Sequence, residues 1–361
     1  MRKWFLLAGV LVSGFGLGCL WDRDTVAMEL KGMPEIQNVI AGRFERNPDL
    51  FYEMRIERIT QAGSAMKIEE YFDVAVAFDR LGKHDEAIGW IDEFDEIVSK
   101  VKMGDAELKD LSYKRNANLG TFFVHRGLKK GDDGMGDLKK GLSLLERSVE
   151  INPQAHFGRE KVQIALVQDR IMEIESGFGL TETDLTREEI REGVIGMMVL
   201  GNAWESARVW SWLLGAIDRE DGNVADLIVR RINEIDSKFD RYELQLPEPL
   251  DGPHLEPEAG KSKGKEVYGI LRMNGDQWSK RREEFLVAGL QSGRHPDTDV
   301  DFWEGYEEVP AAVIEDSVVE RWVWWWSNPQ NVFFAGFGGS VMGVTGLYFW
   351  LKRRKRVLVG R

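Results

Sequence analysis

Cysteine is almost absent from this chain, and that scarcity narrows its chemistry. Cys19 is the single cysteine among 361 residues. One thiol can form neither a disulfide within the chain nor a cysteine metal cluster. The five histidines are scattered along the sequence and show no metal-ligand spacing such as H-E-x-x-H. The sequence therefore predicts no metal site and no thiol catalysis.

Motifs that carry catalysis are also missing. The sequence contains no G-x-S-x-G elbow, no P-loop and no glycine-rich dinucleotide fingerprint after a strand. Residues 132–137 read DDGMGD, but they lack the spacing of an EF-hand calcium loop. We therefore predict a protein that is not an enzyme and has no cofactor.

Positive charge is outnumbered by negative charge in the middle of the chain. The formal net charge is −13, and the two ends carry basic residues without acidic ones, at Arg2, Lys3 and within residues 352–361. An acidic surface repels phosphate backbones, so the middle of the chain is not expected to bind nucleic acid. Hydrophobic residues make up 43% and charged residues 30% of the composition. That balance supports a folded core and excludes disorder of the whole chain.

The most informative stretch is residues 71–94, which read YFDVAVAFDRLGKHDEAIGWIDEF. Tyr71, Ala75 and Phe78 recur at helical spacing, Gly82 follows at a turn, and Ala87 lies in a second helical pattern. Small residues such as alanine let two antiparallel helices approach closely. This stretch resembles the tetratricopeptide (TPR) repeat, a helix–turn–helix unit.

One such unit alone cannot bury its apolar face, so further units are expected. Two later stretches repeat the pattern. The second contains a glycine- and aspartate-rich insertion, which we expect to form a loop between its helices. The third is fainter: Asn202 stands where the first unit has Gly82, Ser211 replaces a large residue and Ile195 a small one. The residues expected to pack the repeats are Tyr71, Ala75, Phe78, Gly82, Ala87, Leu119, Gly120, Phe123, Gly127, Leu145, Pro153 and Ala207.

The TPR resemblance implies an all-α fold, a solenoid of antiparallel helix pairs spanning residues 19–243. Its irregular spacing departs from the family's repeat of about 34 residues. In that family, ligands bind the concave surface made by the first helix of each repeat. By position, this surface would expose Asp73, Asp79, Lys114 and Asn118. The resemblance thus implies an unidentified protein or peptide as partner.

Residues 1–18 have the parts of a signal peptide: Arg2 and Lys3, an apolar core and a glycine-rich end. Cys19 also follows Leu17 and Gly18 as in the end of a bacterial lipobox. Three outcomes stay open: ordinary cleavage, lipidation of Cys19, or retention of the segment as an anchor.

After the repeats, residues 244–265 contain four prolines with glycine and charges, and we predict an extended linker. Residues 266–330 are expected to form a membrane-proximal stalk. An alternative is that residues 266–310 hold a carbohydrate-binding or hydrolase site, in which Trp278, Trp303 and Tyr306 stack on a sugar.

Residues 331–351 carry no charged side chain and are long enough to cross a hydrocarbon core of about 30 Å. Tryptophans precede them, and the basic tail of residues 352–361 follows. Because basic residues stay on the cytoplasmic side, this pattern predicts one transmembrane helix with residues 19–330 periplasmic or extracellular. The sequence as a whole therefore predicts a bacterial, exported, membrane-anchored scaffold or adaptor. Its oligomeric state is left open.

Overall fold

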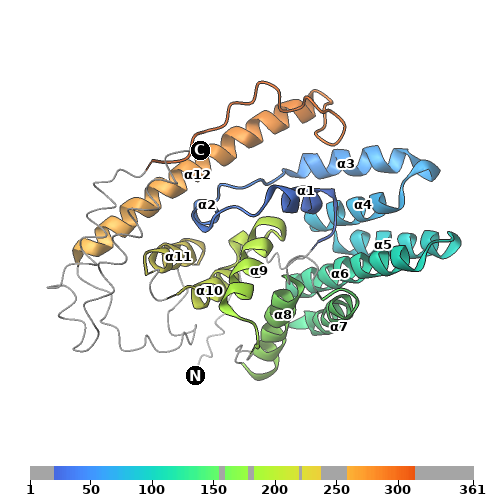
Figure 1. Ribbon diagram of the computed structural model, residues 1–361, viewed down its shortest axis with the longest axis horizontal. Coiled ribbons are helices and arrows are strands. Elements are labelled where there is room, and N and C mark those ends of the chain that lie inside the picture. The colour runs from blue at the N-terminus through green and yellow to red at the C-terminus, as the bar shows by residue number, and fades with distance from the viewer. Residues whose placement is uncertain (1–19, 154–158, 178–182, 219–221, 237–257, 314–361) are drawn as a thin grey trace, which may run out of the picture. The chain divides into compact units, whose positions relative to one another are not determined.

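The computed structural model describes residues 20–153, 159–177, 183–218, 222–236 and 258–313. Throughout these ranges the regular structure is helical, with no strand, which confirms the predicted all-α class (Figure 1). The helices in the described ranges are α1 (Arg23–Lys31), α2 (Ile36–Ala41), α3 (Asp49–Gln61), α4 (Ile68–Arg80), α5 (His84–Lys100), α6 (Asp105–Lys129), α7 (Met135–Ile151), α8 (Arg159–Ser176), α9 (Arg187–Leu200), α10 (Ala207–Gly215), α11 (Gly222–Ile235) and α12 (Glu258–Gln291).

The chain divides into two compact units. The first comprises residues 1–239 and 271–311, and the second comprises residues 240–270 and 312–361. The first unit therefore holds helices α1 to α11 and the part of α12 from Leu271 onward. In the second unit the described part is residues 258–270, which are helical, together with residues 312 and 313.

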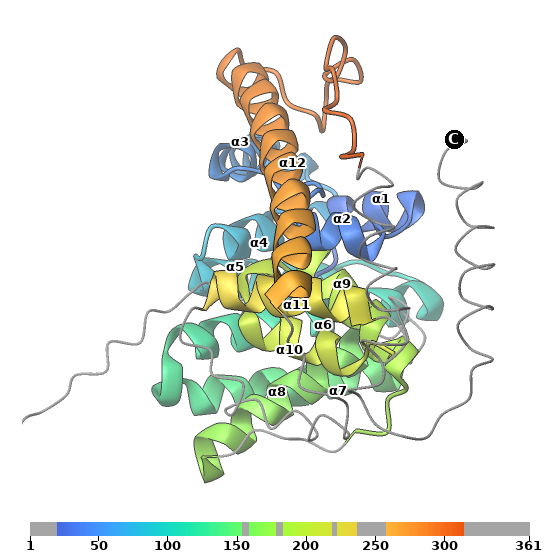
Figure 2. The same ribbon diagram turned by 90° about the vertical axis from the view of Figure 1, so that its left-hand side faces the viewer.

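Within the first unit, helices from α4 to α11 pack on their neighbours in chain order (Figure 1). The short connection Leu81–Lys83 joins α4 to α5, and a 3-10 turn (η2, Gly131–Gly134) joins α6 to α7. Figure 2 shows the same succession from a second direction. Consecutive helices from α4 to α11 therefore lie side by side.

Two turn residues that the sequence aligns, Gly82 and Asn202, share one backbone conformation. Gly82 has φ +69° and Asn202 has φ +59°, and Asn202 is the one described non-glycine residue with positive φ. Asparagine tolerates the left-handed region better than most residues, because its short polar side chain can bond locally. Asn202, after α9, thus takes the same left-handed conformation as Gly82, after α4.

Helices α6 and α7 approach each other through glycine. A β-carbon on Gly141 would lie 2.7 Å from the carbonyl oxygen of Gly120. A β-carbon on Gly134 would overlap the carbonyl group of Gly127. Backbone contact of this kind excludes any side chain at those positions.

The insertion of the second unit is more helical than expected. Helix α6 continues to Lys129, so Gly127 lies inside the helix and does not end it. The left-handed turn residue is Gly131, with φ +63°, and α7 already begins at Met135. The inserted residues mainly lengthen the two helices, because Lys and Leu on both sides of Asp132 and Asp133 favour helix.

Helix α12 overlaps both the predicted linker and the predicted stalk. It begins at Glu258, directly after the last of the four prolines that suggested a linker. Proline disfavours a helix only for residues around and before it, so the chain after Pro257 is free to be helical. Residues 271–311, placed in the stalk by the sequence, belong to the same compact unit as residues 20–239.

The predicted signal peptide, Cys19, the rest of the linker and the predicted membrane span at residues 331–351 lie outside the described residues. Among the helices that the structure describes, none combines the length and apolar character needed to cross a bilayer.

Candidate functional site

The face formed by α4 and α6 is the one on which the TPR resemblance places a ligand. The side chains expected to be exposed there are instead largely enclosed. Asp73 and Asp79 are each 4% exposed, Asn118 is fully buried and Lys114 is half-buried. Asp79 is paired with His84 and His125, whereas Asp73 and Asn118 are covered by another part of the chain.

The cover is the chain's own segment Leu20–Arg23, which precedes and begins α1. Asn118 holds the backbone of this segment with both groups of its side-chain amide. The backbone N–H of Trp21 donates to Asn118 Oδ1 at 2.6 Å, and Asn118 Nδ2 donates to the carbonyl oxygen of Trp21 at 3.0 Å. Asp22 is extended, with φ −149° and ψ 179°. The side-chain amide of Asn118 thus bonds to both the N–H and the C=O of Trp21. Because both are backbone groups, this contact does not depend on the side chain at that position.

The side chains of the segment are recognised individually. Leu20 is 1% exposed and belongs to the apolar cluster that contains Phe72, Leu119 and Phe122. Trp21 meets the ring of Tyr113 edge to face, with centroids 5.5 Å apart, and Lys114 Nζ lies 5.3 Å from the Trp21 ring centroid. We call this surface, made by residues of α4 and α6 around Leu20–Arg23, the α4–α6 groove.

Arg23 closes the segment with a charged contact. Its backbone N–H donates to Asp73 Oδ1 at 2.9 Å, and its Nε donates to Asp73 Oδ2 at 2.7 Å. Hydrogen bonds between charged groups are stronger than neutral ones, and the two-point geometry fixes direction as well. Burial alone would lower the pKa of Arg23, but the hydrogen bond and the charge of Asp73 raise it.

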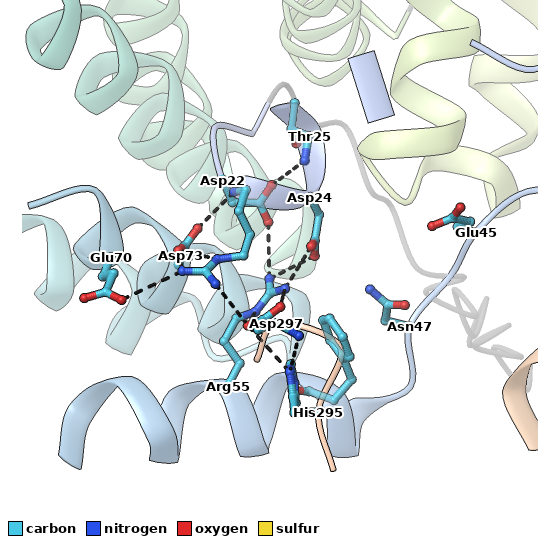
Figure 3. A network of polar contacts seen from close by, with 12 residues as sticks. Asp22, Asp24, Thr25, Glu45, Asn47, Arg55, Glu70, Asp73, His295 and Asp297 are labelled. Atoms are coloured by element: carbon cyan, nitrogen blue, oxygen red, sulfur yellow. Dashed lines mark hydrogen bonds and ion pairs between the residues drawn. The ribbon is translucent and has the colours of Figure 1, made fainter. Parts of the chain in front are cut away.

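Beyond Arg23 the segment joins a buried ionic network (Figure 3). Arg55 on α3 is fully buried and binds Asp24 and Asp297 with bidentate hydrogen bonds of 2.7–2.9 Å. Arg58 also donates to Asp297, at 2.7 Å. Burial would raise the pKa of Asp297, but hydrogen bonds and charge from Arg55 outweigh it and lower that pKa. The network ties α1, α3 and the loop after α12 together.

The surroundings of Asp22 disfavour the charged form of its carboxyl group. Burial, followed by repulsion from Asp24, raises the pKa of Asp22 from 3.8 to about 6. Its carboxylate nevertheless has a structural role, because Oδ1 accepts the backbone N–H of Thr25 at 2.8 Å and caps α1.

A second polar cluster lies at the junction of α4, α5 and α6. His84 Nδ1 lies 2.8 Å from Asp79 Oδ1, and His125 Nδ1 lies 2.8 Å from Asp79 Oδ2. Burial would raise the pKa of Asp79, but the two imidazoles outweigh it and hold that pKa well below its usual range. The ligand atoms of the three residues all lie within 4.8 Å of one another. Among the described residues, this His–Asp–His cluster is the group with the spacing of a metal site.

A cavity of about 190 Å³ opens beside α1, on the side where α4 and α9 end. Its lining includes Met28, Tyr52, Arg80 and Leu200. Arg80 donates to the carbonyl oxygen of Leu200, and burial raises the pKa of Tyr52 to about 12. The cavity is polar and has room for several water molecules.

The structure brings some of the residues expected to pack the repeats into contact, and others lie elsewhere. Tyr71, Ala75, Phe78 and Ala87 on α4 and α5 share one apolar cluster with Leu119 and Phe123 of α6. Gly120 faces Leu145 across the α6–α7 contact. Gly82 forms the α4–α5 turn, Gly127 lies within α6, Pro153 follows α7, and Ala207 begins α10 outside that apolar cluster.

The aromatic residues proposed for sugar stacking contact protein side chains. Trp278 is 7% exposed and its Nε1 donates to Glu308 at 2.8 Å. Trp303 stacks on Phe285 with centroids 5.8 Å apart, and Tyr306 meets the same Phe285 ring at 5.3 Å. Each of these rings therefore contacts a neighbouring side chain, and Trp303 and Tyr306 are half-buried.

Sequence reasoning missed the segment that fills the groove and the His–Asp–His cluster. Leu20 and Trp21 are apolar residues directly after a predicted signal peptide, which was the one local signal for a buried segment. Asp79 and His125 are far apart in sequence and match no ligand motif, so nothing local could pair them. Comparisons with protein-family models, with curated proteins and with solved structures find no match.

Proposed function

We propose that this protein is an interaction scaffold or adaptor that binds an extended peptide segment of a partner in the α4–α6 groove. We further propose that it works on the extracytoplasmic face of a membrane, exported by residues 1–18 and held by a helix at residues 331–351. The TPR-like helix pairs and the terminal sequence patterns support these two parts.

The observation that carries the binding proposal is the pair of hydrogen bonds between the side-chain amide of Asn118 and the backbone N–H and C=O of Trp21. A groove that recognises backbone groups accepts other extended segments as well, because every residue offers the same N–H and C=O groups. The side-chain sites add selectivity: an apolar site at Leu20, an aromatic site at Trp21 and the carboxylate of Asp73. The expected partner segment is therefore apolar, then aromatic, with a basic residue two positions later.

The internal segment competes with such a partner. A tethered segment has an effective concentration in the millimolar range, which weakens the apparent affinity of any ligand for the same groove. We infer that the partner either replaces Leu20–Arg23 or binds when this segment is displaced.

A synthetic peptide with the sequence of residues 20–27 tests the proposal. Labelled peptide is titrated with the full-length protein in detergent micelles, and its fluorescence anisotropy is measured. Loosening the internal segment with Trp21→Ala and Arg23→Ala is expected to strengthen peptide binding by at least roughly tenfold, because the competitor is weakened.

Adding Asn118→Ala to that double variant is expected to abolish the gain in affinity, since the two hydrogen bonds of the side-chain amide to the peptide backbone are lost. A peptide with the same composition in scrambled order is the matched control for charge and hydrophobicity. Binding that is equal for both peptides, or insensitive to Asn118, would contradict the proposal.

A further inference from the structure

The His–Asp–His cluster joins three helices from two successive helix pairs. Asp79 lies near the end of α4, His84 begins α5 and His125 lies in the second half of α6. The side chains of Asp79, His84 and His125 are 1%, 12% and 7% exposed. A buried carboxylate is costly unless it is paired, so these contacts serve a purpose at this junction.

The arrangement has the donor chemistry of a transition-metal site. Imidazole nitrogen and carboxylate oxygen suit Zn²⁺, which binds both at about 2.0–2.2 Å, usually with four ligands. Ligand atoms around such an ion lie about 3 Å apart or a little more. Each imidazole nitrogen lies 2.8 Å from its oxygen of Asp79, and the ligand atoms of the three residues all lie within 4.8 Å of one another. Metal binding therefore requires these side chains to shift from their hydrogen-bonded positions.

We propose that Asp79, His84 and His125 form a binding site for a divalent transition-metal ion, with Zn²⁺ the best-matched ion. The carboxylate of Asp79 and one nitrogen of each imidazole supply three protein ligands, and water supplies the fourth. Because each imidazole that now donates an Nδ1 proton to Asp79 must lose it to bind metal through that atom, binding releases protons.

The site lies where the first helix pair meets the second. A bound ion would fix α5 and α6 against the end of α4, and α4 and α6 are the helices of the groove. The metal proposal stands without the peptide proposal, since it rests on the contacts of Asp79 with His84 and His125 and not on those of Leu20–Arg23. Loss of peptide binding would leave metal binding unchanged.

The test uses the full-length protein in detergent micelles after removal of metal with a chelator. Zn²⁺ is titrated against a chromophoric competitor, and about one equivalent is expected to bind. His84→Gln, His125→Gln and Asp79→Asn are each expected to weaken binding by roughly 100-fold or more. Glu86→Gln, an exposed change on α5, and His254→Gln are the matched controls and should bind as the wild type does.

Two measurements on the wild-type chain keep the proposal falsifiable if a variant fails to fold. Co²⁺ in place of Zn²⁺ is expected to give visible absorption bands of a four-coordinate site with nitrogen and oxygen ligands. Zn²⁺ is also expected to protect His84 and His125 from diethylpyrocarbonate, as mass spectrometry of peptides would show, and to raise the melting temperature by several degrees. Absence of a one-equivalent site, unchanged affinity in all three folded variants, or full labelling of both histidines with Zn²⁺ present would overturn the proposal.

Discussion

At the scale of single residues, several charged side chains around the groove are buried away from water. Asp22 caps α1 and lies beside Asp24, while Arg55 is buried and shares two carboxylates. Removing one partner from such a network leaves a buried charge uncompensated, which usually destabilises a protein more than the pair stabilises it. We therefore expect that these residues position the Leu20–Arg23 segment but that burying their charges lowers the free energy of unfolding.

For Asp22, this predicts that the difference in stability between Asp22→Asn and the wild type depends on pH. The pKa of Asp22 is about 6 in the folded chain and 3.8 in its ordinary state, so the folded chain binds more protons in that window. Stability from this group is therefore greatest below pH 4 and falls as pH rises through 6. The asparagine variant should gain about 2 to 3 kcal/mol relative to wild type between pH 3.5 and pH 7.5.

Chemical denaturation at a series of pH values measures this difference. Asp22→Ala is the control, because it removes the same charge and also the cap on Thr25. It should show the same change with pH, offset by about 1 kcal/mol of constant destabilisation. A difference between wild type and Asp22→Asn that is flat with pH would contradict the expectation.

At the scale of helices, much of the fold follows from spacing in the sequence. Tyr71, Ala75 and Phe78 predicted an amphipathic helix that packs through a small residue, and they lie on α4 in a shared apolar cluster. Asn202 was placed at the position of Gly82 by sequence alone, and both take the left-handed turn conformation. Local patterns of this kind predict elements well because the period of the helix fixes which side chains share a face.

Other features depend on distant parts of the chain and were not predictable in this way. Asn118 and Trp21 come together only after α4 and α6 have packed, and no local pattern links them. Asp79 and His125 are likewise joined by tertiary packing. The start of α12 was missed because proline and glycine composition marks a break without telling where the next helix begins.

The glycine contact between α6 and α7 predicts opposite effects for two similar substitutions. Gly141→Ala should destabilise the protein by about 1 to 3 kcal/mol, because the new methyl group meets the Gly120 carbonyl and Val124. Gly89→Ala in α5, where nothing lies within 4 Å, should stabilise it by about 0.5 to 1 kcal/mol through helix propensity.

Thermal and urea unfolding of the two variants compares the two effects directly. Both changes add one methyl group inside a helix, so they share the same gain in propensity. Equal stability of the two variants would mean that α6 and α7 do not approach as closely as their backbones indicate.

At the scale of the whole molecule, the exported and anchored arrangement is a prediction from the two termini. Basic residues 352–356 should hold the C-terminus in the cytoplasm and leave residues 19–330 outside. A fluorescent reporter fused after Arg361, of a type that folds only in the cytoplasm, is expected to be active. Alkaline phosphatase at the same position, which needs export for activity, is expected to be inactive.

The matched control places the phosphatase after Val313, where the opposite result is expected. An active phosphatase after Arg361 together with an inactive one after Val313 would reverse the predicted orientation. An inactive phosphatase at both positions would indicate that residues 1–18 do not direct export.

The fully enclosed Leu20 has a practical consequence for anyone who shortens this chain. A version that starts at Arg23 would leave the space of Leu20 in its apolar cluster empty and would remove the hydrogen bonds between Trp21 and the side-chain amide of Asn118. Such a version would be prone to self-association through the vacated space. Trimming for crystallisation should therefore stop short of Leu20, and affinity tags belong elsewhere than directly before it.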